Sequence, residues 1–305
     1  MFESWGEGAR PLGDAVTALT GGKAGAYPSG TSLLVRGAGE SVIIDPSVTV
    51  VEKGAPADVD AVINSHGHED HLAGNISFPD ARVHIHEEDL PAVQSLDGLL
   101  GIFGYNMADN PEMGLKFQEE FHYTARPDAV GFQDGHVWDL GGGVSVEAVH
   151  LPGHTRGHSG FRITGGVFFL SDIDLSGFGP YYGDVWSDLE QFEESMKIAR
   201  AEDAKYYVTF HHKGIIEERE TFLEMLDAFE AVIPRRHQAM LDFLAEPRTI
   251  AEMVEHRFVY RPGVEVVFAD AVEGRTARLH VDRMLKRGEA EDLGDGLIRA
   301  VGGVS

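Results

Sequence analysis

Short apolar runs bounded by glycine, proline and polar residues cover the first two-thirds of the chain. Residues 31–36, 41–44, 59–63, 144–149 and 166–170 form such runs, rich in Val, Ile, Leu and Phe. Runs of this length are typical of buried strands, because a helix that buries one face needs about ten or more residues. We therefore expect a sheet-rich α/β domain whose strands end in polar loops.

Apolar residues change their spacing after about residue 217. Over 222–232 they recur at intervals of three or four, which predicts an amphipathic helix. We place a domain boundary at this helix, with one domain over 1–230 and a second over 231–305. Residues 87–133, between two of the strands, predict further helices and a mobile loop.

The second domain has a pattern of three helices followed by a small hairpin. This order is typical of a winged-helix-like fold, which binds DNA in many proteins but also serves for dimerisation or packing. Thr249 is the expected N-cap of the second helix. The expected helices and strand-like pieces are residues 237–244, 249–258 and 264–286, and then the surroundings of Gly288 and Gly294.

Charge and composition limit the partners of the chain. It carries 25 Lys and Arg against 50 Asp and Glu, a formal net charge of −25, and no cysteine. Such a charge disfavours nucleic acid and anionic membranes as partners, and without cysteine there is no thiolate nucleophile or ligand. The N-terminus lacks the pattern of a signal peptide, and no apolar run reaches 18 residues. We expect a cytoplasmic enzyme that does not bind membranes.

Four side chains that can bind metal lie within six residues, directly after the predicted strand 59–63. They are His66, His68, Asp70 and His71. Imidazoles and carboxylates are the ligands that zinc takes when no thiolate is present. Since alternate residues face the same way, His66 and His68 are expected to hold one ion while Asp70 and His71 turn toward a second.

This segment and three later ones resemble the motifs of the metallo-β-lactamase fold hydrolases. Residues 65–71 (SHGHEDH) look like the HxHxDH signature of that family, and 152–159 (PGHTRGHS) like its second motif. Residues 169–172 (FLSD) are similar to the third motif, and 208–211 (VTFH) fall where the last histidine is expected. The resemblance implies a four-layer αβ/βα sandwich for the first domain, with metals at one edge.

The resemblance also implies a complete set of metal ligands. One ion would be held by three histidines and the other by two histidines and a carboxylate, with a second carboxylate between the ions. The ions would be two Zn²⁺, with iron or manganese as alternatives. The implied ligands are His66, His68 and His154 for the first ion, Asp70, His71 and His211 for the second, and Asp172 between them.

Several neighbouring residues have more than one interpretation. His211 is favoured over His212 as the last ligand by its spacing to the preceding strand. Asp45 either hydrogen-bonds a ligand histidine or simply forms a turn. Tyr181, Tyr182 and Lys213 either shape a substrate pocket or pack in loops. His150 and His158 are expected to orient ligands or backbone, and His84, His86 and the acidic run 87–89 to be solvated.

We expect hydrolysis of a small acyl substrate, such as a thioester, lactone or related ester. A hydroxide between the two ions would attack, and Asp70 or Asp172 would accept or relay the proton. Two enzyme alternatives are an endoribonuclease for single-stranded RNA, suggested by the winged-helix-like appendage, and a mononuclear Fe(II) persulfide dioxygenase with the same ligands.

The charge of the second domain argues against nucleic acid as a partner but does not distinguish the hydrolase from the dioxygenase. Residues 236–305 contain ten Lys and Arg against twelve Asp and Glu, with no basic stripe. This balance disfavours RNA, and it also disfavours a DNA-binding metal sensor. The expected partner is therefore a small-molecule substrate. The second domain is expected to pack, to close the pocket or to form a homodimer.

Overall fold

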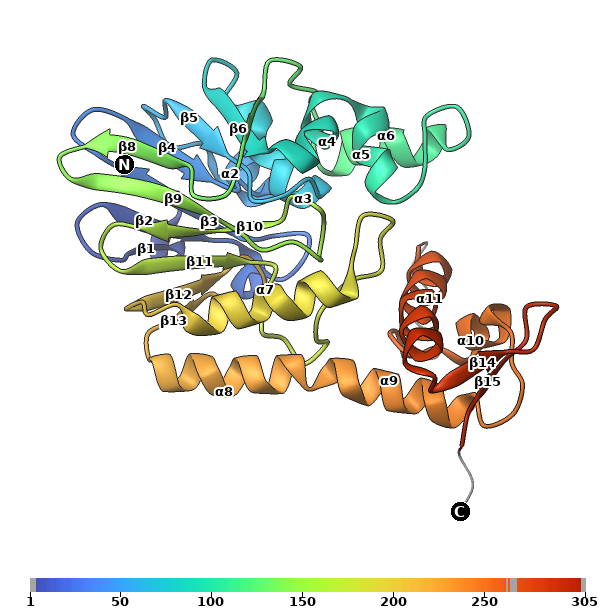
Figure 1. The fold of residues 1–305 in the computed structure, drawn as a ribbon. Helices are drawn as coiled ribbons and strands as arrows, with labels where there is room; N and C mark the ends of the chain where they lie inside the picture. Colours follow the sequence, from blue (N-terminus) through green and yellow to red (C-terminus); the bar gives the residue numbers. More distant parts are fainter. Residues whose placement is uncertain (1–3, 262, 264–267, 303–305) are drawn as a thin grey trace.

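Two β-sheets face each other and carry helices on their outer faces (Figure 1). The computed structural model describes residues 4–261, 263 and 268–302. The strands of the first sheet follow each other in chain order from edge to edge. They are β1 (Ala9–Pro11), β2 (Val16–Thr20), β3 (Thr31–Arg36), β4 (Ser41–Ile44), β5 (Ala61–Ile63), β6 (Arg82–His86) and β7 (Val130–Phe132).

In the second sheet too, strands that are consecutive in the chain are neighbours, from β8 at one edge to β13 at the other. Its members are β8 (Val137–Gly141), β9 (Val144–His150), β10 (Ser159–Ile163), β11 (Val167–Ser171), β12 (Tyr206–Thr209) and β13 (Ile215–Ile216). The helices and 3₁₀ turns that accompany the first sheet are η1 (Gly6–Gly8), α1 (Gly22–Gly25), α2 (Val48–Lys53), α3 (Glu69–Leu72), η2 (Ala73–Ser77), η3 (Glu87–Asp89), α4 (Leu90–Gln94), α5 (Leu96–Ile102) and α6 (Pro111–Glu120). The second sheet is covered by α7 (Leu189–Ala201) and α8 (Arg219–Glu230).

Alternation along the strands divides the apolar side chains between separate cores. In β3, Leu33 and Val35 lie between the two sheets, whereas Leu34 packs against the outer helices. In β11, Phe169 lies between the sheets, and Phe168 belongs to the core under α7 and α8. A strand places successive side chains on opposite faces, so each sheet buries both faces. The four-layer αβ/βα architecture is confirmed.

Parallel pairing brings polar residues to one edge of each sheet. Strands β4, β5, β6 and β7 are parallel neighbours, and so are β11 and β12. The residues that follow β4 and β5 therefore lie beside each other, and so do those that follow β11 and β12. Carboxyl ends of parallel strands are where α/β folds place ligands, since the sheet supports the loops without filling the space between them.

The C-terminal segment contains the predicted elements with shifted bounds. It consists of α9 (Val232–Phe243), α10 (Ile250–His256), α11 (Ala269–Arg287), β14 (Ala290–Asp292) and β15 (Ile298–Ala300). The Thr249 side chain accepts a hydrogen bond from the Glu252 N–H, and the Glu252 carboxylate accepts one from the Thr249 N–H, which confirms the N-cap. The predicted start of the third helix at 264 falls outside the described residues. The winged-helix-like identity of this segment stays a prediction.

The junction between the two predicted domains is helical. Only Ala231 separates α8 from α9, and Figure 1 shows the two helices running nearly end to end. The predicted helix at 237 begins earlier, at Val232, because Pro234 lies in the first turn, where the missing N–H has no intrahelical partner to lose. The domain boundary near 230 stays a prediction.

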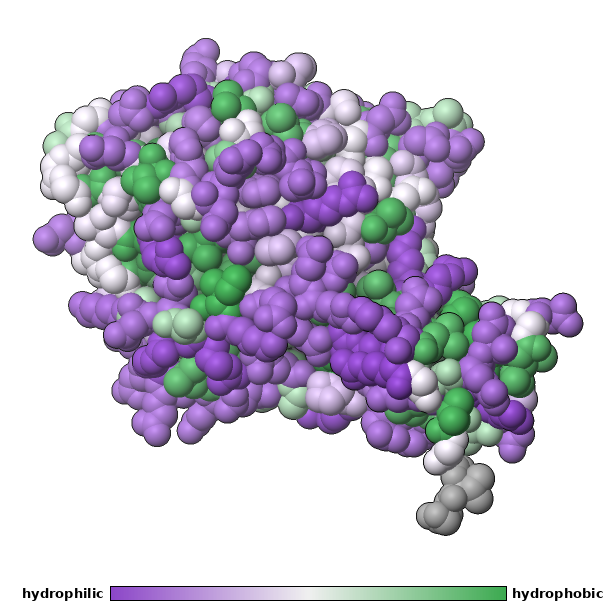
Figure 2. All heavy atoms as spheres, in the orientation of Figure 1, coloured by the Kyte–Doolittle hydropathy of each residue, from purple (hydrophilic) through white to green (hydrophobic). Residues whose placement is uncertain are grey.

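The surface is hydrophilic over most of the face in Figure 2, in keeping with the formal net charge of −25. Hydrophobic residues show as separate groups over the sheets at the left and over the C-terminal helices at the lower right of that view. Within the described part of the chain, no helix has the length and apolar content needed to cross a membrane.

Candidate metal centre

The loop that follows β5 carries the first motif and is held by its own polar groups. Ser65 donates its backbone N–H to Asp45 Oδ1 at 2.6 Å and its hydroxyl to Asp45 Oδ2 at 2.5 Å. Asn64 donates its side-chain amide to the backbone oxygen of His71 at 2.9 Å. Because β4 and β5 are parallel neighbours, Asp45 reaches the loop directly from the end of β4.

Three imidazole nitrogens come together in the first cluster. His66 Nε2 lies 2.9 Å from His68 Nδ1, and His154 Nε2 lies 3.0 Å from the same atom. All three residues are buried. The first two come from the loop after β5, and His154 comes from the loop between β9 and β10 in the other sheet. The two facing sheets thus bring distant motifs together.

A second cluster lies next to the first. His211 Nε2 is 2.9 Å from Asp70 Oδ2, and His71 Nε2 is 3.9 Å from Asp70 Oδ1. The ligand-type atoms of these three buried residues all lie within 4.8 Å of one another. The neighbouring His212 is exposed.

Asp172 lies between the two clusters. Its Oδ2 is 3.3 Å from His154 Nε2 and 4.0 Å from His66 Nε2, while its Oδ1 is 3.1 Å from His71 Nε2. One carboxylate therefore presents one oxygen to each cluster. All seven residues predicted from the motifs come together at this edge of the sandwich.

Several buried polar atoms of the clusters have no hydrogen-bond partner among the described residues, which bears on the kind of group that the clusters can bind. Asp70 Oδ2, His71 Nε2 and Asp172 Oδ1 are buried, and none of them has a hydrogen-bond partner in the described structure. Buried polar atoms are nearly always satisfied, and lone pairs this close repel each other unless a cation or a proton lies between them. This donor set of imidazole nitrogens and carboxylate oxygens fits divalent metal ions.

The local electrostatics favour positive charge at the second cluster. Burial lowers the pKa of His71, but Asp172, Asp45 and Asp70 outweigh it and raise the pKa well above its usual value. Burial likewise lowers the pKa of His211, but Asp172 and Asp70 raise it to about 9. The carboxylates thus create a negative potential that favours a cation at this cluster.

Carboxylates orient two of the clustered histidines from outside the clusters. Asp45 Oδ2 accepts a hydrogen bond from His71 Nδ1 at 2.8 Å, so the interpretation of Asp45 as a histidine-binding carboxylate is correct. Asp184 Oδ2 lies 2.8 Å from His68 Nε2. A bond at one ring nitrogen fixes the ring and its tautomer. His68 therefore presents Nδ1 to the cluster, whereas His71 presents Nε2.

Backbone oxygens orient the rings of two other clustered histidines. His154 Nδ1 lies 2.9 Å from the backbone oxygen of Tyr181. His211 Nδ1 lies 2.9 Å from the oxygen of Gly25 and 3.0 Å from that of Ser29. Both rings therefore direct Nε2 into the clusters.

Two further histidines in and beside the second motif bind backbone, as expected. His158 lies between the oxygen of Leu151, 2.8 Å from Nδ1, and the N–H of Asp172, which donates to Nε2 at 3.2 Å. It thus positions the backbone of Asp172. His150 Nε2 is 2.8 Å from the oxygen of Arg156 and lies outside both clusters.

The prediction of a solvated segment around residues 84–89 is wrong for two residues. His86 is buried, and its ring stacks on His150 from the other sheet, with centroids 4.0 Å apart. Asp89 is fully buried because its carboxylate accepts hydrogen bonds from the Gly67 N–H at 2.9 Å, the Thr155 hydroxyl at 2.6 Å and the Gly157 N–H at 2.8 Å. Asp89 thereby ties the loop of the first motif to that of the second.

The two tyrosines after Asp172 have different roles. Tyr182 is buried, with its hydroxyl 3.0 Å from His280 Nε2 of α11, so it packs against the C-terminal segment. Tyr181 donates its hydroxyl to Asp184 Oδ1 at 3.1 Å and thus supports the carboxylate that holds His68. Lys213 is exposed.

Sequence reasoning missed the support that the C-terminal segment gives to His68. Arg275 of α11 donates to the backbone oxygen of Phe103 at 2.5 Å and to that of Gly183 at 3.4 Å. The ring of Phe103 stacks on His68, with centroids 5.5 Å apart and planes 20° from parallel. Gly183 directly precedes Asp184. No local motif marks these residues, because they meet only in the folded chain.

Comparison with known proteins agrees with this geometry. The family model of the metallo-beta-lactamase superfamily matches residues 28–212. The chain belongs to this superfamily. Membership and the buried His/Asp clusters together indicate a metal-dependent hydrolase that uses divalent metal. Among curated proteins, none matches this chain.

Solved structures of the superfamily share its fold. A metallo-beta-lactamase family protein from Thermus thermophilus is 19% identical, covers 97% of this chain and 99% of its own, and superposes with a TM-score of 0.68. A beta-lactamase domain protein from Burkholderia ambifaria is 16% identical, with coverages of 96% and 93% and a TM-score of 0.67. An archaeal superfamily protein from Sulfolobus tokodaii is 15% identical, with coverages of 88% and 98% and a TM-score of 0.50.

Proposed function

We propose that this protein is a dinuclear metal-dependent hydrolase of a small acyl substrate, namely a thioester, a lactone or a related ester. The observation that carries the proposal is the carboxylate of Asp172, which presents one oxygen to each of two adjacent ligand clusters. We propose zinc for both sites, with iron or manganese as alternatives, since imidazoles and carboxylates suit all three metals. The proposed ligands are His66, His68 and His154 for one ion, Asp70, His71 and His211 for the other, and Asp172 for both.

Divalent cations in such a site lower the pKa of water toward neutrality and polarise a carbonyl oxygen. The chain itself holds the ligands and moves the proton. Asp70 Oδ2 and Asp172 Oδ1 are the two carboxylate oxygens of the clusters that are buried without hydrogen-bond partners in the described structure. In our proposal one of these two carboxylates accepts the proton that the attacking water loses.

The serines near the centre support a mechanism without a covalent intermediate. Ser65 donates its hydroxyl to Asp45, and the hydroxyls of Ser65 and Ser171 lie 2.7 Å apart. Both serines are fully buried, and they are engaged in holding the loops together. With no cysteine in the chain, the attacking group is assigned to water.

The second cluster favours this function over its alternatives. A mononuclear iron dioxygenase has no need of the additional group formed by Asp70, His71 and His211. An endoribonuclease needs a basic surface for the phosphate backbone, whereas residues 236–305 carry slightly more acidic than basic residues. Dinuclear hydrolysis uses both clusters and requires no such surface.

Metal analysis and a substrate panel test the proposal. We expect two zinc ions per chain in protein purified without added metal, and hydrolysis of at least one member of a panel of thioesters, lactones and phosphodiesters. One iron per chain, with oxygen consumption on a persulfide, would contradict the proposal. Salt-sensitive binding and cleavage of single-stranded RNA would also contradict it.

The adjacent histidines at the end of β12 provide a matched pair of variants. His211→Ala removes an imidazole that lies 2.9 Å from Asp70, and we expect it to lower the metal content toward one ion per chain and hydrolysis by at least about 100-fold. His212→Ala removes an exposed ring and serves as the control, with metal content and activity near those of the wild type. Equal behaviour of the two variants would remove His211 from the site.

A further inference from the structure

A cavity of about 560 Å³ lies between the loop after β11 and the C-terminal helices. We call it the arginine pocket. The described residues that line it include three arginines and three aromatic residues but no carboxylate. In a chain with twice as many acidic as basic residues, such a gathering of arginines is unexpected. The six residues are Phe178, Arg235, Arg236, Phe258, Tyr260 and Arg261.

Arg236 carries a buried positive charge into this pocket. Its side chain is only 7% exposed, and it donates to the backbone oxygens of Pro180 and Phe178, both at 2.7 Å. The guanidinium also lies over the rings of Phe178 and Tyr182, at 5.3 and 5.5 Å from their centroids. In the described part of the chain no carboxylate forms an ion pair with it. Buried charges are normally paired, so this one favours an anion close by.

Arg235 and Arg261 lie at the exposed side of the same pocket. Neither forms an ion pair with any residue that the structure describes. Guanidinium groups present several N–H donors in a planar fork, which matches carboxylate and phosphate oxygens. Two forks without an ion-pair partner among the described residues, beside one buried guanidinium, therefore form a site suited to an anionic group.

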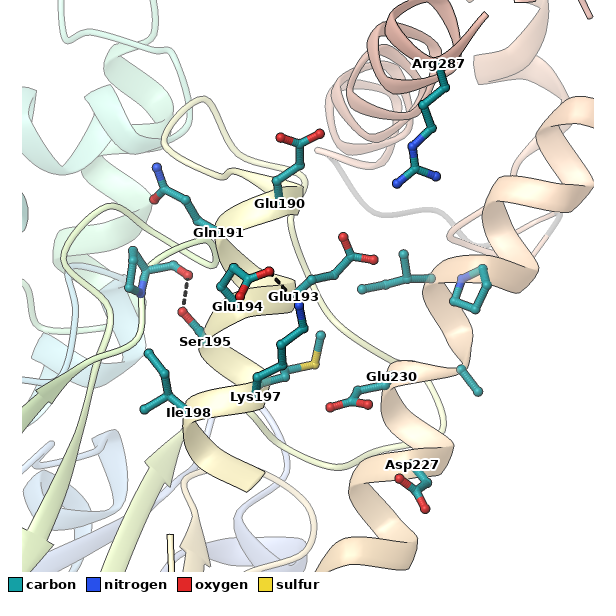
Figure 3. Close-up of a pocket in the computed structure, with 15 residues that line it drawn as sticks. Glu190, Gln191, Glu193, Glu194, Ser195, Lys197, Ile198, Asp227, Glu230 and Arg287 are labelled. Atoms are coloured by element: carbon teal, nitrogen blue, oxygen red, sulfur yellow. Dashed lines mark hydrogen bonds and ion pairs between the residues drawn. The ribbon is translucent and has the colours of Figure 1, made fainter. Parts of the chain in front are cut away.

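The other large cavity has the opposite character. It measures about 920 Å³ and lies between α7 and the helices α8 and α9 (Figure 3). Its lining is mainly acidic, and most of its carboxylates are already paired, as Glu194 is with Lys197 at 2.6 Å. Arg283 and Arg200 pair in the same way with Glu193 and Glu230. This cavity therefore gives no comparable indication of a ligand.

The arginine pocket adjoins the metal centre through one loop, residues 172–188 between β11 and α7. On one side of this loop, the oxygen of Tyr181 and the carboxylate of Asp184 contact His154 and His68. On the other side, the loop binds Arg236 through its carbonyl oxygens. The opposite wall of the pocket is held by α11, because the Glu273 carboxylate accepts hydrogen bonds from the backbone N–H groups of Phe258 and Tyr260 at 2.9 and 2.8 Å.

We propose that the arginine pocket binds an anionic group of the acyl substrate, a carboxylate or a phosphate, while its reactive carbonyl lies at the metal centre. This inference rests on the proposed hydrolase function and names the class of substrate: acyl compounds with an anionic tail. Arg235 and Arg261 pair with the anion, and the buried charge of Arg236 stabilises it. The rings of Phe178 and Tyr260 pack against the part of the substrate that carries it.

Direct binding of simple anions tests the pocket without any hydrolysis. Succinate and inorganic phosphate are titrated into the full chain and followed by calorimetry. We expect the Kd to rise at least about tenfold in the double variant Arg235→Gln and Arg261→Gln, because each charge-assisted hydrogen bond contributes roughly that much. Arg278→Gln removes an exposed arginine of α11 outside the pocket and is the control, with an unchanged Kd. Arg236 is left intact, since its loss would disturb folding.

Kinetics then test whether the anion belongs to the substrate. The probes are a thioester with a terminal carboxylate and its neutral methyl ester. We expect the double variant to raise KM for the charged probe about tenfold or more, and to leave KM for the neutral probe and kcat for both nearly unchanged. Equal effects on both probes, or no anion binding at all, would overturn the inference while hydrolysis itself stands. Anion binding without hydrolysis of either probe would overturn the substrate assignment and point to a free anion as ligand.

Discussion

Asp184 shows how a residue outside every motif defines the metal centre at the scale of single side chains. Its Oδ2 lies 2.8 Å from His68 Nε2, which leaves Nδ1 of that ring within 3.0 Å of the other imidazoles of the first cluster. The Tyr181 hydroxyl holds the second carboxylate oxygen at 3.1 Å. The ligand atom that His68 offers is therefore decided by a residue 116 positions away in the chain.

Asp184→Asn tests this control of His68. The amide replaces a charged acceptor by a neutral one and weakens the orientation of the ring, so we expect metal affinity of the first site to fall about 10- to 100-fold. Competition with a chromogenic chelator measures this affinity. Asp203→Asn, which removes the same charge at an exposed position, serves as the control. Equal affinities of both variants would contradict the assigned role.

His280 gives a prediction about acid stability. Burial, together with the neighbouring His237 and the positive charge of Arg283, lowers its pKa in the folded protein well below the usual 6.5. The unfolded chain therefore binds a proton near pH 6.5 that the folded chain does not bind. The stability that His280 contributes is complete above pH 6.5 and is lost as the pH falls below it.

Chemical unfolding between pH 7.5 and 5 measures this loss. We expect the wild-type free energy of unfolding to fall by up to about 1.4 kcal/mol per pH unit below 6.5 through this one group. His280→Asn removes the titration, so its profile should be flatter over the same range. His212→Asn changes an exposed histidine and should keep the wild-type slope. A slope unchanged in the His280 variant would refute the argument.

At the scale of elements, α11 is part of the support of the metal centre. Val272 packs so closely on Gly183 that a Cβ added to Gly183 would lie 2.3 Å from Val272 Cγ1. Arg275 donates hydrogen bonds to the backbone oxygens of Gly183 and Phe103. Gly183 directly precedes Asp184, which binds His68, and the ring of Phe103 stacks on His68. The C-terminal helix thus fixes two sides of one imidazole.

Arg275→Ala removes this link between α11 and the site. We expect a lower metal affinity and a kcat/KM reduced about tenfold, together with a loss of about 2 kcal/mol in unfolding free energy from the lost hydrogen bonds of a charged group. Arg278→Ala, one turn further along the exposed side of the same helix, is the control. If only stability changes and metal affinity does not, Arg275 is a packing residue alone.

At the scale of the whole molecule, the two sheets and the C-terminal segment meet around one centre. Residues from the loops after β5 and after β9, β11 and β12 form the clusters, so the centre links both halves of the sandwich. Without a cation, buried carboxylates and imidazoles lie with their lone pairs facing each other. Metal removal should therefore lower the free energy of unfolding more than removal of a metal from a surface site would.

Metal removal is expected to destabilise the entire first domain. A ligand that binds only the folded state adds about 4 kcal/mol when its concentration is a thousand times its Kd. Dialysis against a chelator should lower the midpoint of thermal unfolding, and added zinc should restore it. The His211→Ala variant should show a smaller difference between the two states. An unchanged midpoint after complete metal removal would show that the clusters are not coupled to folding.

Much of the fold followed from local pattern. The runs at 31–36 and 41–44 became β3 and β4 with those bounds, because a short apolar run rich in β-branched residues favours a buried strand by its own composition. The seven residues marked by the motifs converge because each lies in the loop or short helix that follows a strand, and these connections meet at one edge of the sandwich. Bounds shifted where context intervened, as at Val232, where a proline was accommodated in the first turn of α9.

Only the tertiary structure decided which other residues serve the site. Asp89 lies in an acidic run that predicts exposure, yet it is buried because three donors from two distant loops surround its carboxylate. Asp184 and the arginine pocket likewise depend on contacts between segments far apart in the chain. Periodicity and motifs record the preferences of neighbouring residues, whereas these contacts arise from the packing of sheets and helices. The sequence by itself therefore determined the layers and the metal-binding motifs, and the fold decided what orients the ligands and where a substrate's charge is received.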